Sequence, residues 1–437
     1  MPLRRFIYTL TMYLLTPAIL YRLAARGLHY REYFERWRER FGFVKDTGKR
    51  ESIWLHAVSM GEVNAALPLI DALMRRYQGA TFVITTVTPT GSERVRRVYG
   101  DRVMNVYLPY DLPASIRRFL DRIRPRLAVI METEIWPNLF FECEARAIPL
   151  VIANARLSEK SLRGYRPIRP LARQALAGAR YIAAQSATDA ARLQELGAPP
   201  ERLGVIGNLK YDMTVPALLI EQAHTMRAGW GARRPVWLAA STHDGEELAV
   251  LKAQAEVLRR FPDALLLIAP RHPERFKPVA QACRSFGFVT RTRSEDVVAS
   301  SDTQCFVVDT LGELLYFYAA TDVAFVGGSL VPIGGHNVLE PAALGVPIVV
   351  GPYLFNFAEI SASLLDAGAA LQVTDGDQLG GEILRLLADE ALSARIGRAA
   401  QDAFEREQGS VLRTLAIIEN VLEEREADNV RRESAKT

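Results

Sequence analysis

The stretch Val-Ala-Phe-Val-Gly-Gly-Ser-Leu-Val-Pro-Ile-Gly-Gly-His-Asn-Val-Leu-Glu-Pro, residues 323–341, indicates most clearly how this chain folds. It begins with an apolar run that is typical of a buried strand and ends in a helical pattern. Paired glycines between the two let the backbone approach a ligand, and a helix that opens at His336 or Asn337 would direct free N–H groups to the same place. The pattern predicts a phosphate site, which the Glu340 carboxylate would extend to a nucleotide by accepting hydrogen bonds from ribose hydroxyls. A glycine-rich loop that serves only close packing is the alternative.

The alternation of apolar runs and helical patterns extends over most of the chain on both sides of this stretch. Amphipathic stretches separate the runs, which is the pattern of βαβ units with a parallel sheet. We therefore expect an α/β protein with two tandem Rossmann-like, doubly wound domains. The runs that read as strands are 53–57, 81–86, 103–108, 127–131, 150–154, 181–184 and 203–206, then 236–240, 265–269, 305–308, 323–326 and 347–350.

The pattern pauses once, and this pause sets the expected domain boundary. Residues 213–235 contain Pro216, a polar helix-like piece and a Gly- and Pro-containing end, which is typical of an interdomain connection. Residues 391–424 read as one or two helices that could cross back onto the first domain, and the charged tail after them lacks an apolar period. The expected division is a membrane anchor at 1–42, a first domain at 43–214, a linker at 215–235, a second domain with terminal helices at 236–424, and a disordered tail at 425–437.

The first forty residues differ from the rest of the chain. Phe6 to Tyr21 is a run of 16 largely apolar residues with arginines on both sides. The run is slightly short for a membrane span and lacks the small-residue cleavage site of a secretory signal. Residues 27–42 then place aromatic side chains on one helical face and charged ones on the rest, which suits a bilayer surface. We expect membrane contact from this region; a helix packed on the main domain is the alternative for 27–42.

Composition excludes several classes of protein. With 437 residues, of which 24% are charged, the chain is long enough for two domains with full cores and is neither disordered nor fibrous. The formal net charge of +4 is too small to suggest a nucleic-acid partner. The three cysteines are widely spaced in apolar runs, which indicates reduced thiols and no disulfide framework. The six histidines show no metal-binding spacing, so no metal site is expected.

Polar residues gather where the predicted strands end, and ligands of open parallel sheets bind beyond the carboxyl ends of the strands. If the two sheet ends face each other, these residues line a single interdomain cleft. In the first domain they are Ser59, Gly61 and Glu62, then Glu132 and Glu134, then Lys210; in the second they are Ser241 to His243, Pro270 to His272, Asp309 to Glu313, and the glycine-rich loop with Ser329 and His336.

These residue types suit the transfer of a group from a phosphate-bearing donor to a hydroxyl acceptor. The leaving phosphate needs positive charge or N–H dipoles, which Arg271, the helix start near Asn337 and Lys210 can supply. The acceptor hydroxyl needs a base, for which Glu62 is the best-placed candidate. A glutamate in a first helical turn is also favoured by the helix dipole without any catalytic role, and the dipole would lower its pKa unless burial offsets it. Glu132 can likewise be read as an acidic residue at a helix start.

The chain resembles the 3-deoxy-D-manno-octulosonic acid (Kdo) transferase family, with motifs in one order from the N-terminal apolar segment to about residue 420. The resemblance implies the GT-B glycosyltransferase fold and transfer of Kdo from CMP-Kdo to the lipid A precursor (lipid IVA) in lipopolysaccharide biosynthesis. It also implies a place on the cytoplasmic face of the Gram-negative inner membrane. The motifs are Ser59-Met60-Gly61-Glu62, Glu132-Thr133-Glu134-Ile135-Trp136-Pro137-Asn138, Gly207-Asn208-Leu209-Lys210, Pro270-Arg271-His272, and Gly334-Gly335-His336-Asn337-Val338-Leu339-Glu340-Pro341.

The resemblance also implies roles for individual residues. Glu62 would be the general base in a single displacement that inverts the anomeric centre, with Glu132 and Lys210 stabilising the transition state. Neither a catalytic metal nor another cofactor is implied. Because the arginines near the N-terminus would be drawn to the cytoplasm, a true span would place the catalytic domains outside, so a flat monotopic anchor fits better. The residues that would hold CMP are Pro270, Arg271, Leu311, Gly312, Glu313, Asn337, Val338, Leu339 and Glu340.

Two other functions stay open from the sequence. One is a UDP-sugar-dependent transferase or epimerase with the same fold, and the other is an inert nucleotide-sugar-binding protein at the membrane. The number of Kdo residues transferred, the preferred lipid A precursor and the oligomeric state do not follow from the sequence.

Overall fold

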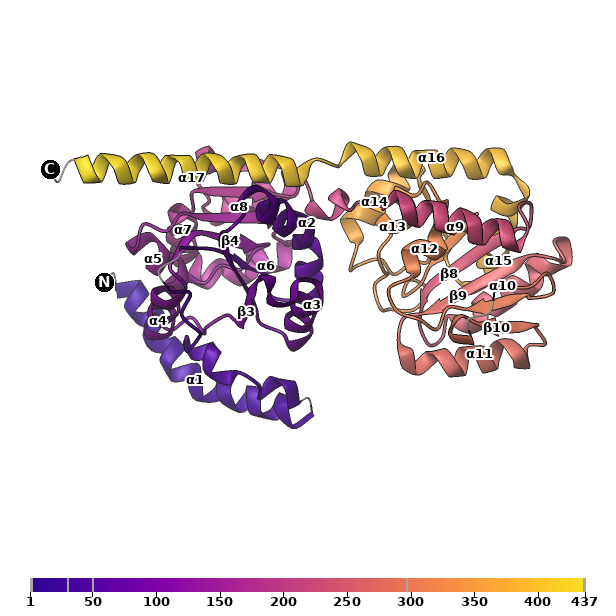
Figure 1. Ribbon diagram of the computed structural model, residues 1–437, viewed down its shortest axis with the longest axis horizontal. Helices are drawn as coiled ribbons and strands as arrows, with labels where there is room; N and C mark the ends of the chain where they lie inside the picture. Colours follow the sequence, from indigo (N-terminus) through magenta and orange to yellow (C-terminus); the bar gives the residue numbers. More distant parts are fainter. Residues whose placement is uncertain (1–2, 30, 49–50, 296–297, 435–437) are drawn as a thin grey trace. The chain divides into compact units, whose positions relative to one another are not determined.

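The computed structural model describes residues 3–29, 31–48, 51–295 and 298–434, and the chain forms two compact units. Unit 1 comprises Met1–Met213 and Gln408–Thr437, and unit 2 comprises Thr214–Glu407. Each unit holds one parallel sheet covered by helices on both faces, so the predicted pair of doubly wound α/β domains is confirmed (Figure 1).

Unit 1 is built on seven parallel strands in the order β3-β2-β1-β4-β5-β6-β7. The order reverses between β1 and β4, and this switch point is where such sheets bind ligands. Ile53 and Leu55 pack on one side of β1 and Trp54 on the other, which explains why the strand is continuously apolar. The strands are β1 (Ser52–His56), β2 (Thr81–Thr86), β3 (Met104–Tyr107), β4 (Pro125–Met131), β5 (Leu150–Ala155), β6 (Tyr181–Ala184) and β7 (Leu203–Val205).

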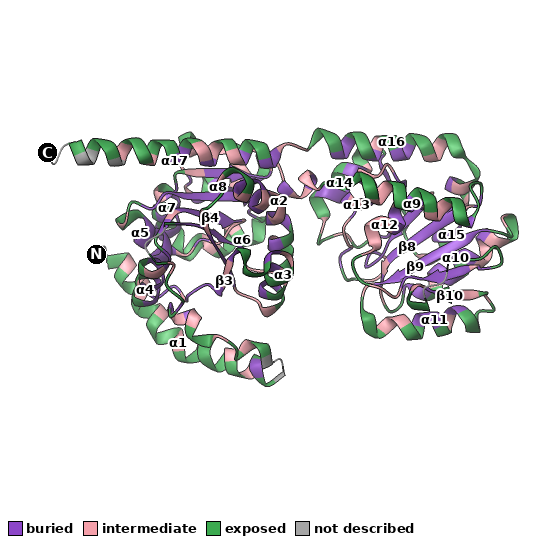
Figure 2. Cartoon of the chain, viewed as in Figure 1, coloured by how far each residue is buried: buried purple, intermediate pink, exposed green. Residues whose placement is uncertain are grey.

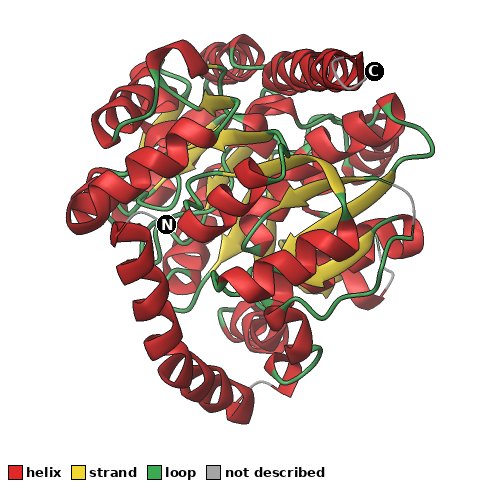
Figure 3. Ribbon diagram, turned by 90° about the vertical axis from the view of Figure 1, so that its left-hand side faces the viewer, coloured by secondary structure: helices red, strands yellow, loops and turns green. Residues whose placement is uncertain are grey.

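Helices connect these strands and cover both faces of the sheet, whose central strands are buried (Figure 2, Figure 3). Several begin with Pro at their first position, where the missing N–H costs nothing. The helices of unit 1 that connect strands are α2 (Met60–Arg76), α3 (Pro89–Tyr99), α4 (Pro113–Ile123), α5 (Pro137–Ala145), α6 (Glu159–Tyr165), α7 (Arg169–Gly178) and α8 (Ala187–Leu196).

Unit 2 repeats this plan with seven parallel strands in the order β10-β11-β9-β8-β12-β13-β14, and its switch point lies between β8 and β12. The strands are β8 (Val236–Thr242), β9 (Leu265–Pro270), β10 (Thr290–Thr292), β11 (Cys305–Val307), β12 (Val323–Val326), β13 (Ile348–Val350) and β14 (Ala370–Gln372). The helices are α9 (Ala217–Trp230), α10 (Glu247–Arg260), α11 (Phe276–Ser285), α12 (Leu314–Tyr318), α13 (Leu339–Ala343), α14 (Ala358–Asp366), α15 (Gly376–Ala388) and α16 (Glu390–Arg406).

The expected domain boundaries need two corrections. Most of the linker expected at 215–235 is helix α9, whose Ala223 and Trp230 are buried in the core of unit 2. The tail expected to be disordered at 425–437 is helical as far as Ser434, as part of α17 (Ser410–Ser434). Helix α17 belongs to unit 1, because Ile418, Val421 and Leu422 share one helical face and are buried in the core that α2 also lines. Residues 435–437 lie outside the described residues.

The N-terminal segment consists of helix α1 (Leu3–His29) and two 3₁₀ turns, η1 (Arg31–Tyr33) and η2 (Trp37–Phe41). Helix α1 is long and apolar enough to cross a membrane, and none of its most apolar stretch is buried in the protein. The single amphipathic helix expected at 27–42 is replaced by these turns. Arg36 and Arg40, expected on a charged outer face, instead donate to the Asn105 and Val87 carbonyls and lie over the Tyr107 ring.

Candidate active site

Glu62 lies at the switch point of unit 1, in the first turn of α2. Helix α2 begins directly after β1 because Ser59 caps it, and the Glu62 side chain turns back toward the cap. Its carboxylate accepts hydrogen bonds from the Val58 N–H at 2.8 Å and the Ser59 hydroxyl at 3.1 Å. This local motif places a carboxylate beside the carboxyl end of the strand.

Burial, helped by the nearby charges of Glu132 and Glu134, raises the pKa of Glu62 to about 7 against the lowering effect of the Val58 and Ser59 hydrogen bonds. The lowering that the helix dipole alone would cause is therefore outweighed. Burial also raises the pKa of Glu134 to about 7, although the Trp136 indole N–H donates to it at 2.9 Å. The structure thus brings together the carboxylates that follow β1 and β4.

Two backbone features shape the space at this edge. Glu132 has a left-handed φ of 56°, a strained conformation for a residue with a side chain, and its N–H is held by the Ala153 carbonyl. A Cβ added to Gly61 would meet only the Ser59 hydroxyl, at 3.8 Å. Packing within the protein therefore does not require a glycine at position 61, and a methyl group would fit there.

Lys210 lies on a short 3₁₀ turn, η6 (Leu209–Asp212), which packs against α2, the helix that carries Glu62. The turn is held in place by side-chain caps: Asn154 accepts from the Leu209 N–H at 3.0 Å and Asn208 accepts from the Lys210 N–H at 3.1 Å. Asp212 accepts from the N–H groups of Gly409 and Val411 and so fixes the start of α17 to the same turn. Lys210 is half-exposed.

In unit 2, the first glycine pair of the loop after β12 does not offer its N–H groups to a ligand. The fully buried carboxylate of Glu246 accepts from the N–H groups of Gly328 at 2.7 Å, Ser329 at 3.0 Å and Leu330 at 2.9 Å, and also from that of His243 at 2.9 Å. A Cβ on Gly327 would lie 2.7 Å from the Ser241 carbonyl. This half of the loop therefore serves close packing, the alternative that the sequence left open.

Ser329, expected in the cleft, has a structural position instead. It is fully buried, and its hydroxyl donates to the Val326 carbonyl at 2.5 Å and accepts from the Gly351 N–H at 2.8 Å. Sequence reasoning also missed Glu246. The available signal was its place after β8, which matches the place of Glu62 after β1.

The helix expected to open at His336 or Asn337 begins later, as α13 at Leu339. Its first N–H is already satisfied, because the Asn337 side chain accepts from the Leu339 N–H at 3.1 Å while its amide donates to Glu340 at 3.1 Å. Val338 and Leu339 are buried, and burial raises the pKa of Glu340. What this segment presents is therefore the Asn337–Glu340 pair and not a free helix end.

Three histidines and one arginine gather at the switch point of unit 2. His243 follows β8, His336 lies in the loop after β12, and their Nε2 atoms are 2.7 Å apart. The ring of His272 packs edge-on against that of His243, with centroids 5.2 Å apart. Arg271 follows Pro270, the last residue of β9. Burial is the main cause that lowers the pKa of His243 and of His336, and the Arg271 charge adds to it. Arg271 supplies the positive charge of this cluster, and the histidines beside it add hydrogen-bonding groups to the candidate donor site.

The third segment of the expected donor site follows β11. Leu311 is 63% exposed, and Gly312 has a left-handed φ of 90°. The Glu313 carboxylate is engaged within unit 2, because Arg293 donates to both of its oxygens, at 2.8 and 3.1 Å, and holds its pKa below the usual range. The exposed Leu311–Gly312 turn is thus the part of this segment that can meet a ligand.

Among the described residues, no group of three or more His, Cys, Asp or Glu side chains could hold a metal ion.

Comparisons with known proteins agree with this arrangement. A family model described as 3-deoxy-D-manno-octulosonic-acid transferase (kdotransferase) matches residues 35–213. A 3-deoxy-D-manno-octulosonic acid transferase of Haemophilus influenzae is 39% identical over 96% of this chain and 99% of its own length. A transferase of the same name from Bordetella pertussis is 36% identical over the same shares.

Among solved structures, a glycosyltransferase from Rickettsia africae matches 86% of this chain and 99% of its own, with a TM-score of 0.55 and 13% sequence identity. This likeness concerns the fold alone, and it agrees with the GT-B architecture expected from the two parallel-sheet units. The identity to the curated relatives over nearly the full length shows more: the chain is a glycosyltransferase and belongs to the 3-deoxy-D-manno-octulosonic acid (Kdo) transferase family.

Proposed function

We propose that this enzyme transfers Kdo from CMP-Kdo to the lipid A precursor (lipid IVA) in a single displacement that inverts the anomeric centre, with Glu62 as the general base. The acceptor hydroxyl attacks the anomeric carbon, its proton passes to the Glu62 carboxylate, and the bond from that carbon to the phosphate oxygen breaks to release CMP. The observation that carries the proposal is the state of Glu62: a part-buried carboxylate whose pKa is raised to about 7. A base with this pKa is available at neutral pH and still strong enough to accept a proton.

The neighbours of Glu62 support the same reaction. Positive charge that develops on the sugar as the phosphate leaves would be stabilised by the Glu132 carboxylate, which lies near enough to raise the pKa of Glu62. Lys210, on the turn packed against α2, would stabilise the negative charge of the transition state. The open space at Gly61 leaves room for an acceptor close to the base.

The donor would bind to unit 2 at the residues that follow β9, β11 and β12. We propose that Arg271 binds the phosphate of CMP and that the Asn337–Glu340 pair binds the ribose hydroxyls, because an amide and a carboxylate supply the donors and acceptors that hydroxyls need. Pro270, Val338 and Leu339 would shape the site through the backbone, and the exposed Leu311–Gly312 turn with Glu313 would complete it.

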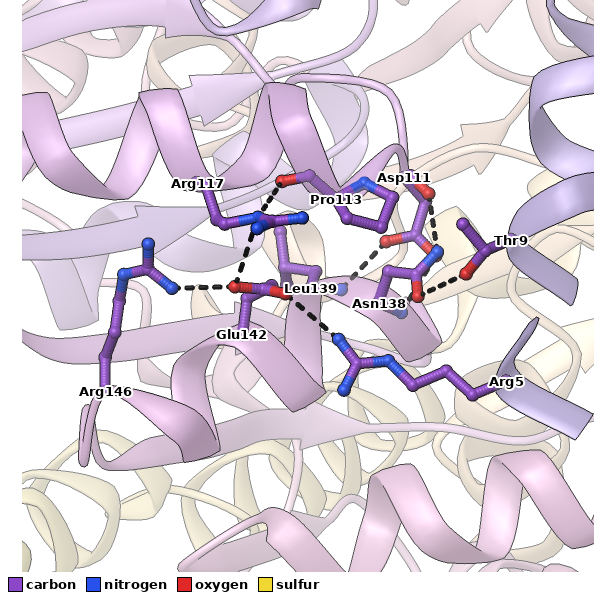
Figure 4. A network of polar contacts seen from close by, with 9 residues as sticks. All are labelled: Arg5, Thr9, Asp111, Pro113, Arg117, Asn138, Leu139, Glu142 and Arg146. Atoms are coloured by element: carbon purple, nitrogen blue, oxygen red, sulfur yellow. Dashed lines mark hydrogen bonds and ion pairs between the residues drawn. The ribbon is translucent and has the colours of Figure 1, made fainter. Parts of the chain in front are cut away.

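Helix α1 supports a monotopic place on the cytoplasmic face of the inner membrane. Its first turns are bound to unit 1 by polar contacts: Arg5 with Glu142 at 3.0 Å and Thr9 with Asn138 at 3.0 Å (Figure 4), and also Tyr8 with Asp111 at 2.8 Å. A helix that crossed the bilayer from this end would have to give up these contacts. Its outer face carries exposed apolar side chains, which suit a helix lying in the lipid surface. They are Leu3, Phe6, Ile7, Leu10, Tyr13, Leu14, Leu15, Leu20, Tyr21 and Leu28.

The experiment gives the purified full chain CMP-Kdo and lipid IVA in detergent and analyses the lipid by mass spectrometry. We expect a gain of one or more Kdo residues with an equal release of CMP, and an inverted anomeric centre by NMR of the product. Release of CMP with no gain in lipid mass would refute transfer to this acceptor. A retained anomeric configuration would refute the single displacement and the role of Glu62 as base.

A further inference from the structure

We propose that His243 and His336 form a proton-linked anion site, a hydrogen-bonded pair that takes up one proton as an anionic group of the donor binds beside Arg271. The anionic group is the phosphate or the carboxylate of the sugar acid. This inference rests on the proposed CMP-Kdo donor. It adds uptake of a proton on donor binding, which none of the donor residues named above provides.

The geometry of the pair shows an in-plane hydrogen bond. The two rings are parallel within 3°, their centroids are 5.0 Å apart, and the two Nε2 atoms are 2.7 Å apart. Because the centroids are nearly twice as far apart as the nitrogens, the rings lie edge to edge and not face to face. One Nε2–H therefore points at the lone pair of the other Nε2.

This hydrogen bond fixes how many protons the pair can hold. Only one Nε2 can carry a hydrogen, so in the neutral pair the accepting ring carries its own hydrogen on Nδ1 and the donating ring has a bare Nδ1. One more proton fits on that bare Nδ1 without breaking the bond, and the pair then has a single positive charge and two Nδ1–H donors. A second extra proton would need the accepting Nε2 and would break the bond.

In the protein without a ligand, the surroundings favour the neutral form of both rings. Burial lowers the pKa of His336 to about 4, with further lowering by Arg271, His243 and His272. Burial, His272 and Arg271 also lower the pKa of His243. An anion that binds here offsets the Arg271 charge and attracts a proton, so it raises the pKa of the pair.

The carboxylates on the neighbouring elements already have hydrogen-bond or ion-pair partners, and the Arg271 charge also acts on Glu340, so an anionic ligand would add the counter-charge for the histidine pair. Glu246 is held by four backbone N–H groups, and Glu340 by Asn337. Asp244 and Glu247 are paired with Arg275.

The loop is built to hold this arrangement. A Cβ on Gly328 would lie 2.9 and 3.0 Å from atoms of the His336 ring, so the glycine is what lets the ring lie across the loop. Glu246 binds the N–H groups of both His243 and Gly328, and thereby fixes the two residues that carry or contact the pair. The pair also lies at the switch point of the sheet, where ligands of such folds bind.

The test follows the histidine side chains by NMR in the full chain with isotope-labelled histidine, titrated from pH 4.5 to 8 without a ligand, with CMP and with free Kdo. An opposite charge within reach shifts a pKa by about 1–3 units, so we expect one imidazole of the pair to titrate higher by that amount when the site is filled. A shift with CMP assigns the phosphate, and a shift with Kdo alone assigns the carboxylate.

Variants identify the residues. His336→Gln or His243→Gln should abolish the pKa shift, and either variant suffices if the other fails to fold. His224 is an exposed histidine on α9, so His224→Gln is the matched control and should leave the shift unchanged.

The affinity of the wild type for the donor should weaken as pH rises from about 4 to the raised pKa, and this pH dependence should flatten in His336→Gln. Unshifted imidazoles in a protein that binds CMP and transfers Kdo would overturn this proposal alone. Absence of any CMP or Kdo binding would overturn the donor assignment and this site together.

Discussion

The two units place a glutamate at the same topological position, after the first strand of the sheet, and use it differently. Glu62 follows β1 and accepts from one backbone N–H and one hydroxyl, next to two other carboxylates. Glu246 follows β8, is fully buried and accepts from four backbone N–H groups. The four donors use the hydrogen-bonding capacity of the Glu246 carboxylate and fix its position. Glu62 has fewer donors and can still accept a proton. Hydrogen-bond supply, and not position in the fold, thus separates a candidate catalytic glutamate from a structural one.

The largest effect is expected from Glu62→Gln, which removes the base but keeps the shape of the side chain. Turnover should fall by roughly two to four orders of magnitude, because general base catalysis contributes about that much. CMP binding should be unchanged, since the donor site lies in unit 2. Kdo transfer measured by mass spectrometry, with calorimetric CMP binding alongside, checks both statements. Turnover within tenfold of the wild type would remove Glu62 from the role of base.

Glu246→Gln should lower the stability of unit 2 through the loop that Glu246 holds, and not through the chemical step. The amide oxygen can replace one carboxylate oxygen, but the amide NH₂ would face backbone N–H groups and leave buried donors unsatisfied. With about 1–3 kcal/mol for each unsatisfied group, unit 2 should lose ~2–5 kcal/mol of unfolding free energy. Denaturant unfolding measures the loss, and Glu359→Gln, on the exposed side of α14, serves as the control. A stability equal to that of the control would show that the four hydrogen bonds do not hold the loop.

Glu62→Gln should differ from Glu246→Gln in its effect on stability. It should stabilise the protein at high pH, whereas Glu246→Gln should destabilise it. The folded pKa of Glu62 is about 7 against an ordinary value of 4.5, so the folded state binds more protons between these pH values. The wild type therefore loses stability as pH rises from about 4.5 to 7, and the variant does not. Above pH 7 the variant should be more stable by about 1–3 kcal/mol, and below pH 4.5 the gain should vanish. A variant less stable than the wild type at pH 8 would contradict the burial of a charge at this site.

The smallest effect on stability is expected from Gly61→Ala, compared with Gly328→Ala in the loop of unit 2. Position 61 has room for a methyl group and lies in a helix, so alanine should raise stability by about 0.5–1 kcal/mol. Turnover should nevertheless fall if an acceptor uses that space. At Gly328, the added methyl group would collide with His336 at a left-handed φ of 67°, so alanine there should destabilise. Thermal unfolding of the two variants compares them directly; equal shifts would mean that both glycines serve packing.

The sequence predicts features that depend on neighbouring residues better than features that depend on residues far apart in the chain. The strand expected at 323–326 is β12 to the residue, because a short apolar run between turn signals is defined locally. The position of Glu62 in the first turn of a helix after a strand is local as well. The hydrogen bonds from the glycine-rich loop to Glu246 join residues more than eighty positions apart. The packing of α17 on unit 1 depends on its apolar face, which contacts the core that α2 also lines. The binding of the loop by Glu246 has no local signal, so the sequence predicts a phosphate site there. The apolar pattern of 391–424 does indicate helices that could cross back onto the first domain, but the charged residues after it lack that pattern, so their helix is not predicted.

The docking of α1 has a geometric consequence for the choice of acceptor. Asn138 binds Thr9 of α1 (Figure 4). It lies in the first turn of α5, directly after the segment that carries Glu132 and Glu134. The buried carboxylate of Asp111 accepts from the Asn138 and Leu139 N–H groups and from the Tyr8 hydroxyl. Asp111 therefore also links α1 to the start of α5. If the outer face of α1 lies in a lipid surface, the height of these carboxylates above that surface is fixed by the fold. The enzyme would then select acceptor hydroxyls by their height above the bilayer, so that the thickness of the headgroup is itself a criterion of specificity.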